Sequence, residues 1–323
     1  MSTWSKLRRS ETTIDFVGLR KRWFVISAVI ITLSILSFVV RGGFNLGIEF
    51  EGGLALQSPN PSGADVGSVR SVMDEIGVTG ATIQELGDGE SIRVTAGVLA
   101  AGVEADAVDA LADVTGVERD EVSISAVGPS FGALVLQRSL IALAVFLGAV
   151  VLYISWRLEF KMAMAAIVAL LHDLVITGGV YALTGFEVTP ATVVAILTIL
   201  GYSLYDTVVV FDKIEELVIE DEKSPYSAIV NNSMNAVLGR SLNTSITSLI
   251  PIGSILLVGA FILGASTLRE FALALFVGVG VGTFSSIFIA APLLAIWKEG
   301  EDEWQERAEK AKKTARRSKS ARS

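Results

Sequence analysis

One carboxylate lies inside a long apolar run of this chain, and the chemistry open to it there is proton binding. The acid is Asp206, a few residues before Asp212 and Lys213 end the run. An ionised carboxylate at membrane depth is costly unless it is paired or hydrated, so acids in such positions commonly have a function. Asp206 is therefore a candidate proton-coupling residue, and the alternative is a structural hydrogen bond between helices. Tyr205 and Thr207 flank it as supporting polar groups.

A basic partner for this acid begins the next polar stripe along the chain. Arg240, Thr244 and Thr247 recur at helical spacing and share one face of a predicted helix. Arg240 and Asp206 are expected at similar depth, where the opposite charge would hold the carboxylate ionised. A conformational change that joins or separates the pair would then release or bind a proton. The alternative for Arg240 is that its long side chain reaches the membrane surface.

Two further titratable residues, His172 and Asp173, stand near the middle of another apolar run. Histidine is the residue type that titrates near physiological pH, and His172 is the only histidine in the chain. With Asp206 and Arg240 they form a candidate proton-handling set. Each also has a structural alternative, as a hydrogen-bonded residue inside a helix bundle.

Composition indicates that a membrane positions these groups. Hydrophobic residues make up 51% of the 323, and the mean hydropathy is +0.59, which is too apolar for a soluble globule. The chain has no cysteine, so it has neither a disulfide framework nor a thiolate metal site. The single histidine also excludes the H-E-x-x-H motif of metalloproteases. Neither a metal nor a cofactor is expected.

Six runs are long enough to cross a bilayer core, which needs about 20 apolar residues. They are predicted at 23–40, 139–156, 162–183, 188–211, 241–263 and 268–297. The predicted fold class is a polytopic α-helical membrane protein with six transmembrane helices. Arg22 and Arg41 bracket the first run and no small-residue cleavage site follows it, so it is interpreted as an anchor.

Lys and Arg concentrate before the first run, in the turn at 156–161 and in the C-terminal tail, which places both termini in the cytoplasm. The long segment between the first two runs then lies outside, and it is rich in acids. The predicted parts are a cytoplasmic segment 1–22, transmembrane helix 23–41, an extracytoplasmic domain 42–131, transmembrane helices two to six within 132–297, and a basic cytoplasmic tail 298–323.

The extracytoplasmic domain has alternating strand and helix signals. We predict an extended stretch at 47–57, a helix at 63–76, strands at 81–86 and 90–96, a helix at 104–114 and a strand at 121–127. This β-α-β-β-α-β order is typical of the ferredoxin-like fold. The fold hosts many activities, so it does not identify a function.

Two other patterns have structural interpretations. Gly278 and Gly282 lie within an apolar run with no strand before it, so they predict close helix packing and not a nucleotide loop. The tail interleaves acids with its bases, which favours a solvated helix that can meet anionic lipid. No nucleic-acid partner is expected.

Five ordered motifs resemble those of the SecD/SecF family of membrane proteins. The segment NLGIEFEGG, with Gly47, Glu49, Gly52 and Gly53, is similar to the family's G-I-D-F-x-G-G signature. The segment VGPSFG, with Gly128 and Pro129, resembles its V-G-P-x-x-G motif. The pair His172 and Asp173 and the segments 201–213 and 240–248 resemble blocks of the SecF branch. The likeness extends from about residue 23 to residue 297.

The resemblance implies a function in bacterial Sec protein export, as an accessory subunit and not an enzyme. A chain of this kind would be half of a twelve-span unit of the RND superfamily in the cytoplasmic membrane, with SecD as the other half. Its further partners would be the SecYEG channel, YajC as a candidate, the translocating unfolded polypeptide and membrane lipids. By position, Asp206 matches the family's proton-coupling acid and Arg240 the arginine that works with it.

Two positions depart from the family pattern, and two other function classes stay open. Tyr205 stands where Asn is common before the coupling acid, and Glu49 stands where Asp is usual. One alternative is a half-subunit of an RND-type exporter of lipids or small molecules. The other is a structural assembly factor of the translocase, in which the membrane acids only join helices.

Overall fold

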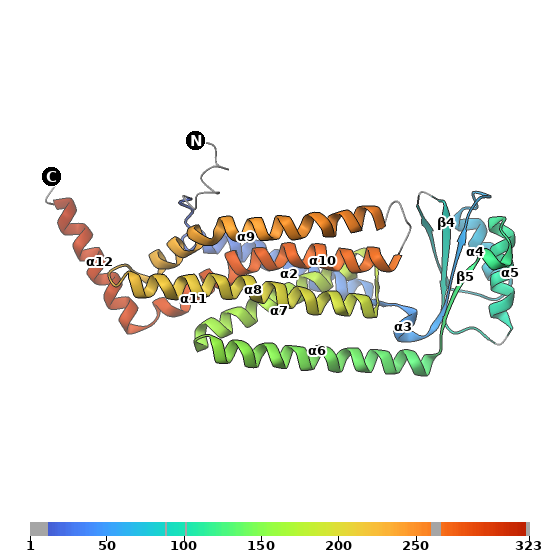
Figure 1. Ribbon diagram of the computed structural model, residues 1–323, viewed down its shortest axis with the longest axis horizontal. Helices are drawn as coiled ribbons and strands as arrows, with labels where there is room; N and C mark the ends of the chain where they lie inside the picture. The colour runs from blue at the N-terminus through green and yellow to red at the C-terminus, as the bar shows by residue number, and fades with distance from the viewer. Residues whose placement is uncertain (1–11, 88, 101, 260–265, 321–323) are drawn as a thin grey trace.

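A computed structural model describes residues 12–87, 89–100, 102–259 and 266–320. Two parts lie end to end: a long helical bundle and a small domain built on a β-sheet, at the right of Figure 1. The C-terminal helix α12 (Asp302–Ser320) lies at the opposite end of the bundle from the sheet. The predicted segment 1–22 and the tail 298–323 are described only over 12–22 and 298–320.

The bundle consists of long helices that run along the molecule's length (Figure 1). They are α2 (Arg20–Arg41), α6 (Pro129–Arg157), α7 (Phe160–Thr184), α8 (Pro190–Glu220), α9 (Tyr226–Leu257) and α10 (Ser266–Ser285), which continues through a π-helical segment (Ser286–Ala290) into α11 (Ala291–Glu299). Over the described residues, five helices are long and apolar enough to cross a membrane, with Leu268–Glu299 taken as one. The chain is therefore a polytopic helical membrane protein.

Helix α9 is the one predicted span that does not reach this hydropathy. It has the length, at 32 residues, but Arg240, Asn243 and Thr244 interrupt its apolar residues. The prediction placed a span at 241–263, whose last residues, 260–263, lie outside the described part of the chain. Among the described residues, five helices thus qualify as spans by length and composition, and the sixth predicted span is not confirmed.

Local sequence signals explain where several helices begin and end. Thr189 caps α8 in a reciprocal capping box with Thr192, and Pro190 occupies the first helical position, where its missing N–H is no loss. Gly185 ends α7 in the left-handed conformation. The helices extend beyond the predicted apolar windows, because polar residues such as Arg138 continue the helix outside the apolar stretch.

The sheet domain is the part formed by β2 to β5. Its elements are β2 (Gly53–Pro59), α4 (Val66–Glu75), β3 (Thr82–Leu86), β4 (Ser91–Ala96), α5 (Val103–Thr115), a 3₁₀ turn (Arg119–Glu121) and β5 (Ser123–Val127). The strand order is β3-β4-β2-β5, and each neighbouring pair is antiparallel. The predicted element order is observed.

The two helices of the sheet domain cover the central strands and form its core. Val69 and Met73 of α4 and Leu111 of α5 are buried against Ile92 and Val94 of β4. Asp65 caps α4 by accepting a hydrogen bond from the backbone N–H of Ser68 at 2.7 Å. The bonds from Ser68 hold the pKa of Asp65 below its usual value.

The segment predicted as extended at 47–57 is instead broken by a helical turn. Strand β1 (Asn45–Leu46) is followed by α3 (Ile48–Glu51) before β2 begins. Gly52 and Gly53 adopt φ values of 80° and 145°, which redirect the chain between α3 and β2. β1 pairs in parallel with β6 (Glu187–Val188), in the connection between α7 and α8. The sheet domain is thereby joined to the bundle by a second small sheet.

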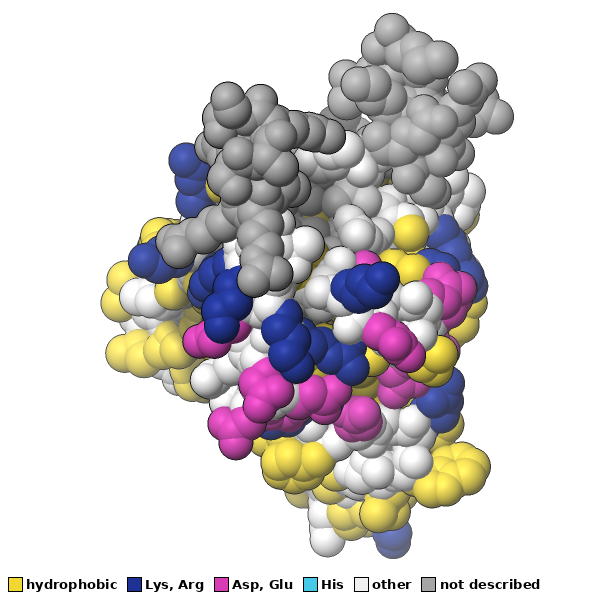
Figure 2. Space-filling view, turned by 90° about the vertical axis from the view of Figure 1, so that its left-hand side faces the viewer, with side chains coloured by type: hydrophobic (Ala, Val, Ile, Leu, Met, Phe, Trp, Pro, Cys, Tyr) yellow, Lys and Arg dark blue, Asp and Glu magenta, His cyan; other side chains and the backbone are white. Residues whose placement is uncertain are grey.

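The end of the bundle opposite the sheet domain is strongly charged. Figure 2 shows basic and acidic side chains gathered on this end. Arg157 pairs with Asp212 at 2.6 Å and Lys161 with Glu301 at 2.8 Å, which connects the α6–α7 turn to α8 and to the start of α12. The tail is not wholly solvated as predicted, because Trp304 of α12 is buried in the bundle core.

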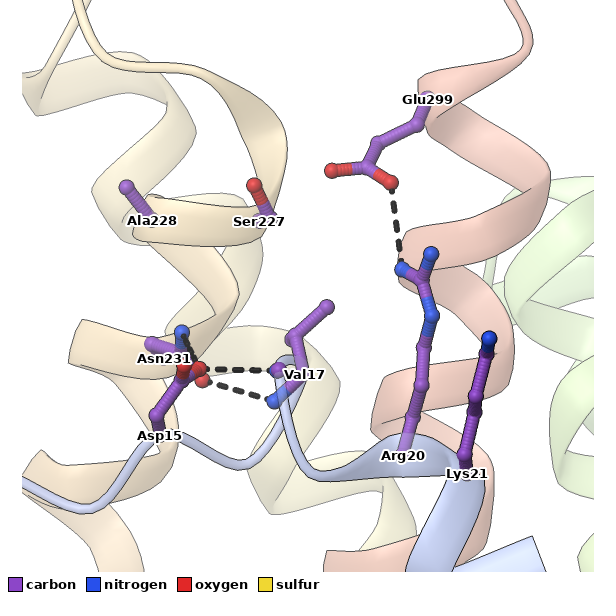
Figure 3. Close-up of a pocket in the computed structure, with 9 residues that line it drawn as sticks. Asp15, Val17, Arg20, Lys21, Ser227, Ala228, Asn231 and Glu299 are labelled. Atoms are coloured by element: carbon purple, nitrogen blue, oxygen red, sulfur yellow. Dashed lines mark hydrogen bonds and ion pairs between the residues drawn. The ribbon is translucent and has the colours of Figure 1, made fainter.

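The N-terminal segment before α2 is held against α9 at this same end. The side chain of Asn235 bonds to both backbone groups of Ile14, and Asn231 accepts a hydrogen bond from the Val17 backbone N–H at 3.0 Å. The neighbouring side chain of Phe16 is fully buried in the bundle core. Figure 3 shows the polar cavity of about 430 Å³ beside this segment, with Arg20 reaching Glu299.

Candidate functional site

Asp206 lies on the face of α8 that meets α9, inside the bundle. Its side chain is 7% exposed, and Oδ1 accepts a hydrogen bond from the Ser241 hydroxyl at 2.8 Å. Oδ2 is buried and has no hydrogen-bond partner among the described residues. A carboxylate with one bonded and one free oxygen can take a proton on the free oxygen without breaking its existing contact. The predicted candidate therefore has a geometry suited to proton exchange.

Arg240 is not hydrogen-bonded to this acid in the structure, so the predicted pair stays a prediction. Its Nη2 donates instead to the Tyr205 hydroxyl at 3.0 Å. Ser241, the next residue on α9, occupies the position facing Asp206 instead. Arg240 and Tyr205 lie on the exposed side of this contact, with Tyr205 56% exposed. The guanidinium stays within electrostatic range of the acid.

Asp173 is the more deeply buried of the two aspartates, with no exposed surface. Its Oδ1 lies 3.0 Å from Nδ1 of His172, and its Oδ2 accepts hydrogen bonds from Ser203 at 2.5 Å and Ser285 at 2.9 Å. Because these serines belong to α8 and α10, the single carboxylate joins three helices. His172 stacks against Phe284, and its Nε2 has no partner among the described residues.

The four predicted proton-handling residues thus form two groups, each beside further hydroxyls. Of these hydroxyls Thr207 was predicted as a supporting group, whereas Ser245, Thr283 and Ser286 were not. Thr207 bonds to the Ser203 carbonyl at 3.0 Å and to the Ser286 hydroxyl at 2.7 Å. On the other side of Asp206, Ser245 bonds to the Ser241 carbonyl and to Thr283. The signal that could have indicated these contacts between α8, α9 and α10 is the recurrence of serines and threonines at helical spacing on the facing helices.

Small residues bring these helices close enough for the hydroxyls to meet. A Cβ added to Gly282 of α10 would lie 2.9 Å from the Ser203 Cβ, and one at Gly278 would overlap the side chain of Ile199. The predicted close packing at Gly278 and Gly282 is therefore confirmed. Thr244 and Thr247 bond to the carbonyls of Arg240 and Asn243 on their own helix and do not contact Asp206.

The signature residues do not lie near Asp206 but at the joint between the bundle and the sheet domain. A Cβ on Gly52 would lie 2.8 Å from the Cα of Pro129, and one on Gly132 would lie 2.8 Å from the Phe50 carbonyl oxygen. Gly53 lies against the Ala96 carbonyl, and Gly128 is the residue before α6. These glycines let α3 and the start of α6 approach at backbone distance. Oε2 of Glu49 lies beside Gly47.

Comparison with known proteins identifies this combination of parts. The family model described as protein export membrane protein SecD/SecF, C-terminal, matches residues 107–300. The chain belongs to the SecD/SecF family. It is 41% identical over 304 residues to the protein translocase subunit SecF of Streptomyces coelicolor, covering 92% of this chain and 80% of that protein. The SecF of Mycobacterium tuberculosis H37Rv is 38% identical, with 91% of this chain and 69% of that protein covered.

A solved structure of the same family has the same architecture. The crystal structure of SecDF, a translocon-associated membrane protein from Thermus thermophilus, superposes with a TM-score of 0.80 at 32% identity. The match covers 90% of this chain and 39% of SecDF, so this chain spans about two fifths of that fused protein. Among the described residues of this chain, no group of three or more acids or histidines is placed to hold a metal ion.

Proposed function

We infer that the chain is an accessory subunit of a bacterial protein translocase, of the SecF type. The support is the family match together with the names of its relatives, translocase subunits with 33–41% identity over most of the chain. This is a transport function with no bond-making step. The fused SecDF relative supports SecD as the partner, because there the two halves form one chain.

We further propose the arrangement in the membrane. The chain has six spans, with α9 as the fifth, and both termini lie in the cytoplasm of a cell whose cytoplasmic membrane it crosses. The support is the charged end of the bundle in Figure 2, since cytoplasmic loops carry the excess of basic residues. The sheet domain then lies outside as a ferredoxin-like domain, which its strand order supports. SecYEG, YajC, an unfolded polypeptide and membrane lipids are the further proposed partners.

The mechanism we propose uses proton exchange at Asp206. The observation that carries it is the free, buried Oδ2 beside a bonded Oδ1. Arg240, held by the Tyr205 hydroxyl in this structure, would favour the ionised acid if it moved toward Asp206. Arg240 then alternates between Tyr205 and Asp206. This alternation couples the charge of Asp206 on α8 to the position of α9. Movement of the helices is then transmitted to the sheet domain, which holds the emerging polypeptide.

The test is the Asp206→Asn variant, which keeps the side-chain volume and removes the titration. We expect export stimulated by a proton gradient to disappear in membranes depleted of the native subunit, while copurification with SecD persists. Asp74→Asn, an exposed acid of α4, is the matched control and should support export normally. Gradient-stimulated export by Asp206→Asn at the wild-type rate would refute the proton function.

The assembly-factor and exporter alternatives give different outcomes in the same preparation. If the membrane acids only join helices, Asp206→Asn should lose SecD during purification. If the chain serves an exporter, the wild type should copurify with an RND-type partner half and without the translocon channel. Recovery of SecD and the channel with both wild type and variant supports the proposed function alone.

A further inference from the structure

A second group of charged residues lies at the joint between the sheet domain and the bundle, with two acids buried and the other members half-buried. Four elements contribute five side chains to it. They are Glu49 of α3, Arg93 of β4, Glu187 of β6, and Arg269 and Glu270 at the start of α10. Only Glu49 belongs to a signature motif. The group lies at the end of the bundle opposite the charged surface of Figure 2.

Within this group, the described residues show one direct contact between the bundle and the body of the sheet, the pair formed by Arg93 and Glu187. Arg93 Nη2 lies 3.8 Å from Glu187 Oε2, and the two side chains are 12% and 6% exposed. That distance allows charge attraction but is too long for a hydrogen bond. Glu187 Oε2 has no hydrogen-bond partner among the described residues, and neither has Glu49 Oε2. Glu187 is buried and Glu49 is half-buried, and the buried Oε2 of each lacks the hydrogen bond that normally compensates burial.

The α10 residues add one charge of each sign. Glu270 is 3% exposed and lies within electrostatic range of Glu187, Glu49 and both arginines. The guanidinium of Arg269 lies over the ring of Phe186, 4.6 Å from its centroid, and its Nε has no partner among the described residues. Arginine can rest on an aromatic face in this way while its charge acts on neighbouring acids.

The other polar groups around the cluster are occupied. The Tyr181 hydroxyl of α7 donates to the backbone carbonyl of Glu270, and Arg41 of α2 donates to the carbonyl of Leu183. Three carboxylates therefore face two guanidinium groups. If all five were ionised, one negative charge would be left in excess at a poorly hydrated place, which is costly. A single bound proton removes that excess.

We propose that Glu49, Glu187, Glu270, Arg93 and Arg269 form a second proton-binding site, which holds one proton in common and thereby docks the sheet domain on the bundle. Loss of this proton leaves the excess negative charge between Glu187 and its neighbours. The carboxylate of Glu187 is then ionised with no hydrogen-bond partner for Oε2, and its attraction to Arg93 across 3.8 Å does not offset the cost of keeping it from water. The sheet domain then moves away on its two covalent connections, which lets water reach the carboxylate. The ligand is a proton from the side of the membrane on which the sheet domain lies.

The direction of the pH dependence follows from Glu187, which lies between the membrane-crossing helices. Burial raises the pKa of Glu187, Arg93 lowers it in part, and Glu49 raises it further. A carboxyl whose pKa is higher in the docked form binds its proton more tightly there. Docking is therefore strongest at pH values below the pKa that the Glu187 carboxyl has in the undocked form. It weakens as pH rises through the higher pKa of the docked form.

The experiment measures the distance between the two parts in the full chain. The chain has no cysteine, so Ser71→Cys on α4 and Thr184→Cys at the end of α7 provide two unique spin-label sites, both exposed. Pulsed electron paramagnetic resonance in lipid nanodiscs, between about pH 5 and about pH 9, covers the range of shifted carboxyls. We expect a longer-distance population that grows with pH with the slope of a single proton. Glu187→Gln and Glu270→Gln should each remove this growth.

A matched control and a separate readout distinguish this site from the proposed function at Asp206. Asp74→Asn removes an exposed acid of the sheet domain and should keep the wild-type pH response. The distance change is measured without a proton gradient and through Glu187 and Glu270, whereas the Asp206 proposal is tested by gradient-stimulated export, so either proposal can fail while the other holds. A wild-type distance distribution that is unchanged across the pH range overturns the second site. So does a wild-type response in both glutamine variants.

Discussion

Asp173 and Asp206 are both buried aspartates in neighbouring helices, yet their surroundings differ. Asp173 has three partners, His172, Ser203 and Ser285, which use both of its oxygens. Asp206 has one partner on Oδ1 and a free Oδ2. A fully bonded carboxylate stabilises one arrangement of helices, whereas a half-bonded one can change its charge at small structural cost. Burial alone therefore does not separate a structural acid from a functional one.

The largest effect on stability is expected at Asp173. Asp173→Ala leaves two serines and a histidine without their common partner, and unmade buried bonds cost about 1–3 kcal/mol each. We expect the free energy of unfolding in detergent to fall by about 3 kcal/mol. Asp206→Asn, the matched variant, should change it by less than about 1 kcal/mol, since only one bond is altered. Equal losses would contradict the distinction between the two acids.

The contact of α10 with α8 tests how the Asp173 group depends on close helices. Gly282→Val places branched carbons where a Cβ is already 2.9 Å from Ser203, so α10 must move away. Overfilling of this kind costs about 1–3 kcal/mol, and thermal unfolding should show it. Gly280→Val is the control, because a Cβ there meets nothing within 4 Å. A Gly282→Val protein as stable as the wild type would mean that α8 and α10 can separate here without loss of stability.

The serines that hold the two acids allow a sharper comparison. Ser241→Ala removes the only hydrogen bond to Asp206 among the described residues, whereas Ser203→Ala leaves Asp173 with two. Each should cost about 1 kcal/mol in unfolding. Only Ser241→Ala should change the pH profile of gradient-driven export, because it alone alters a carboxylate that exchanges its proton. The same profile change in Ser203→Ala would assign the proton path to both acids.

The smallest effect is expected at Tyr205. Tyr205→Phe removes one exposed hydrogen bond to Arg240, so stability should stay within about 0.5 kcal/mol. Without this bond the Arg240 guanidinium is free, and gradient-stimulated export should change. That change should be several-fold smaller than the change caused by Asp206→Asn. Thr247→Val is the control. Thr247 lies on α9 with Arg240, and its hydroxyl bonds to backbone carbonyls of that helix. No change with Tyr205→Phe would show that Arg240 does not need this anchor.

The sequence predicted the elements better than it predicted contacts between them. Hydropathy located the long helices because the bilayer sets their length, and alternation located the strands. The Arg240 and Asp206 pair stays a prediction. Helical spacing places residues on a face but does not say which of Arg240 and Ser241 contacts the acid, and in this structure it is Ser241. The sequence did not predict the helical turn α3. The positive φ values of Gly52 and Gly53, which end this turn, go with the close approach of Gly52 to Pro129, a contact distant in the sequence.

The joint cluster shows a second limit of sequence reading. Glu187 lies in β6 and Glu270 at the start of α10, both far from Arg93 along the chain, and they meet only where the helices and the sheet domain pack together. No local spacing marks such a group. Glu49 was singled out by its motif, but its charged neighbours became visible only in three dimensions.

The linker between β5 and α6 is a single residue. β5 ends at Val127 and α6 begins at Pro129, so Gly128 alone separates a strand of the sheet domain from a helix of 29 residues. At 1.5 Å per residue that helix is roughly 43 Å long. A rigid arm of this length, fixed to a small domain through one joint, converts a slight tilt at either end into a displacement of several ångströms at the other. α6 is thus long enough to carry a displacement of the sheet domain along the whole bundle.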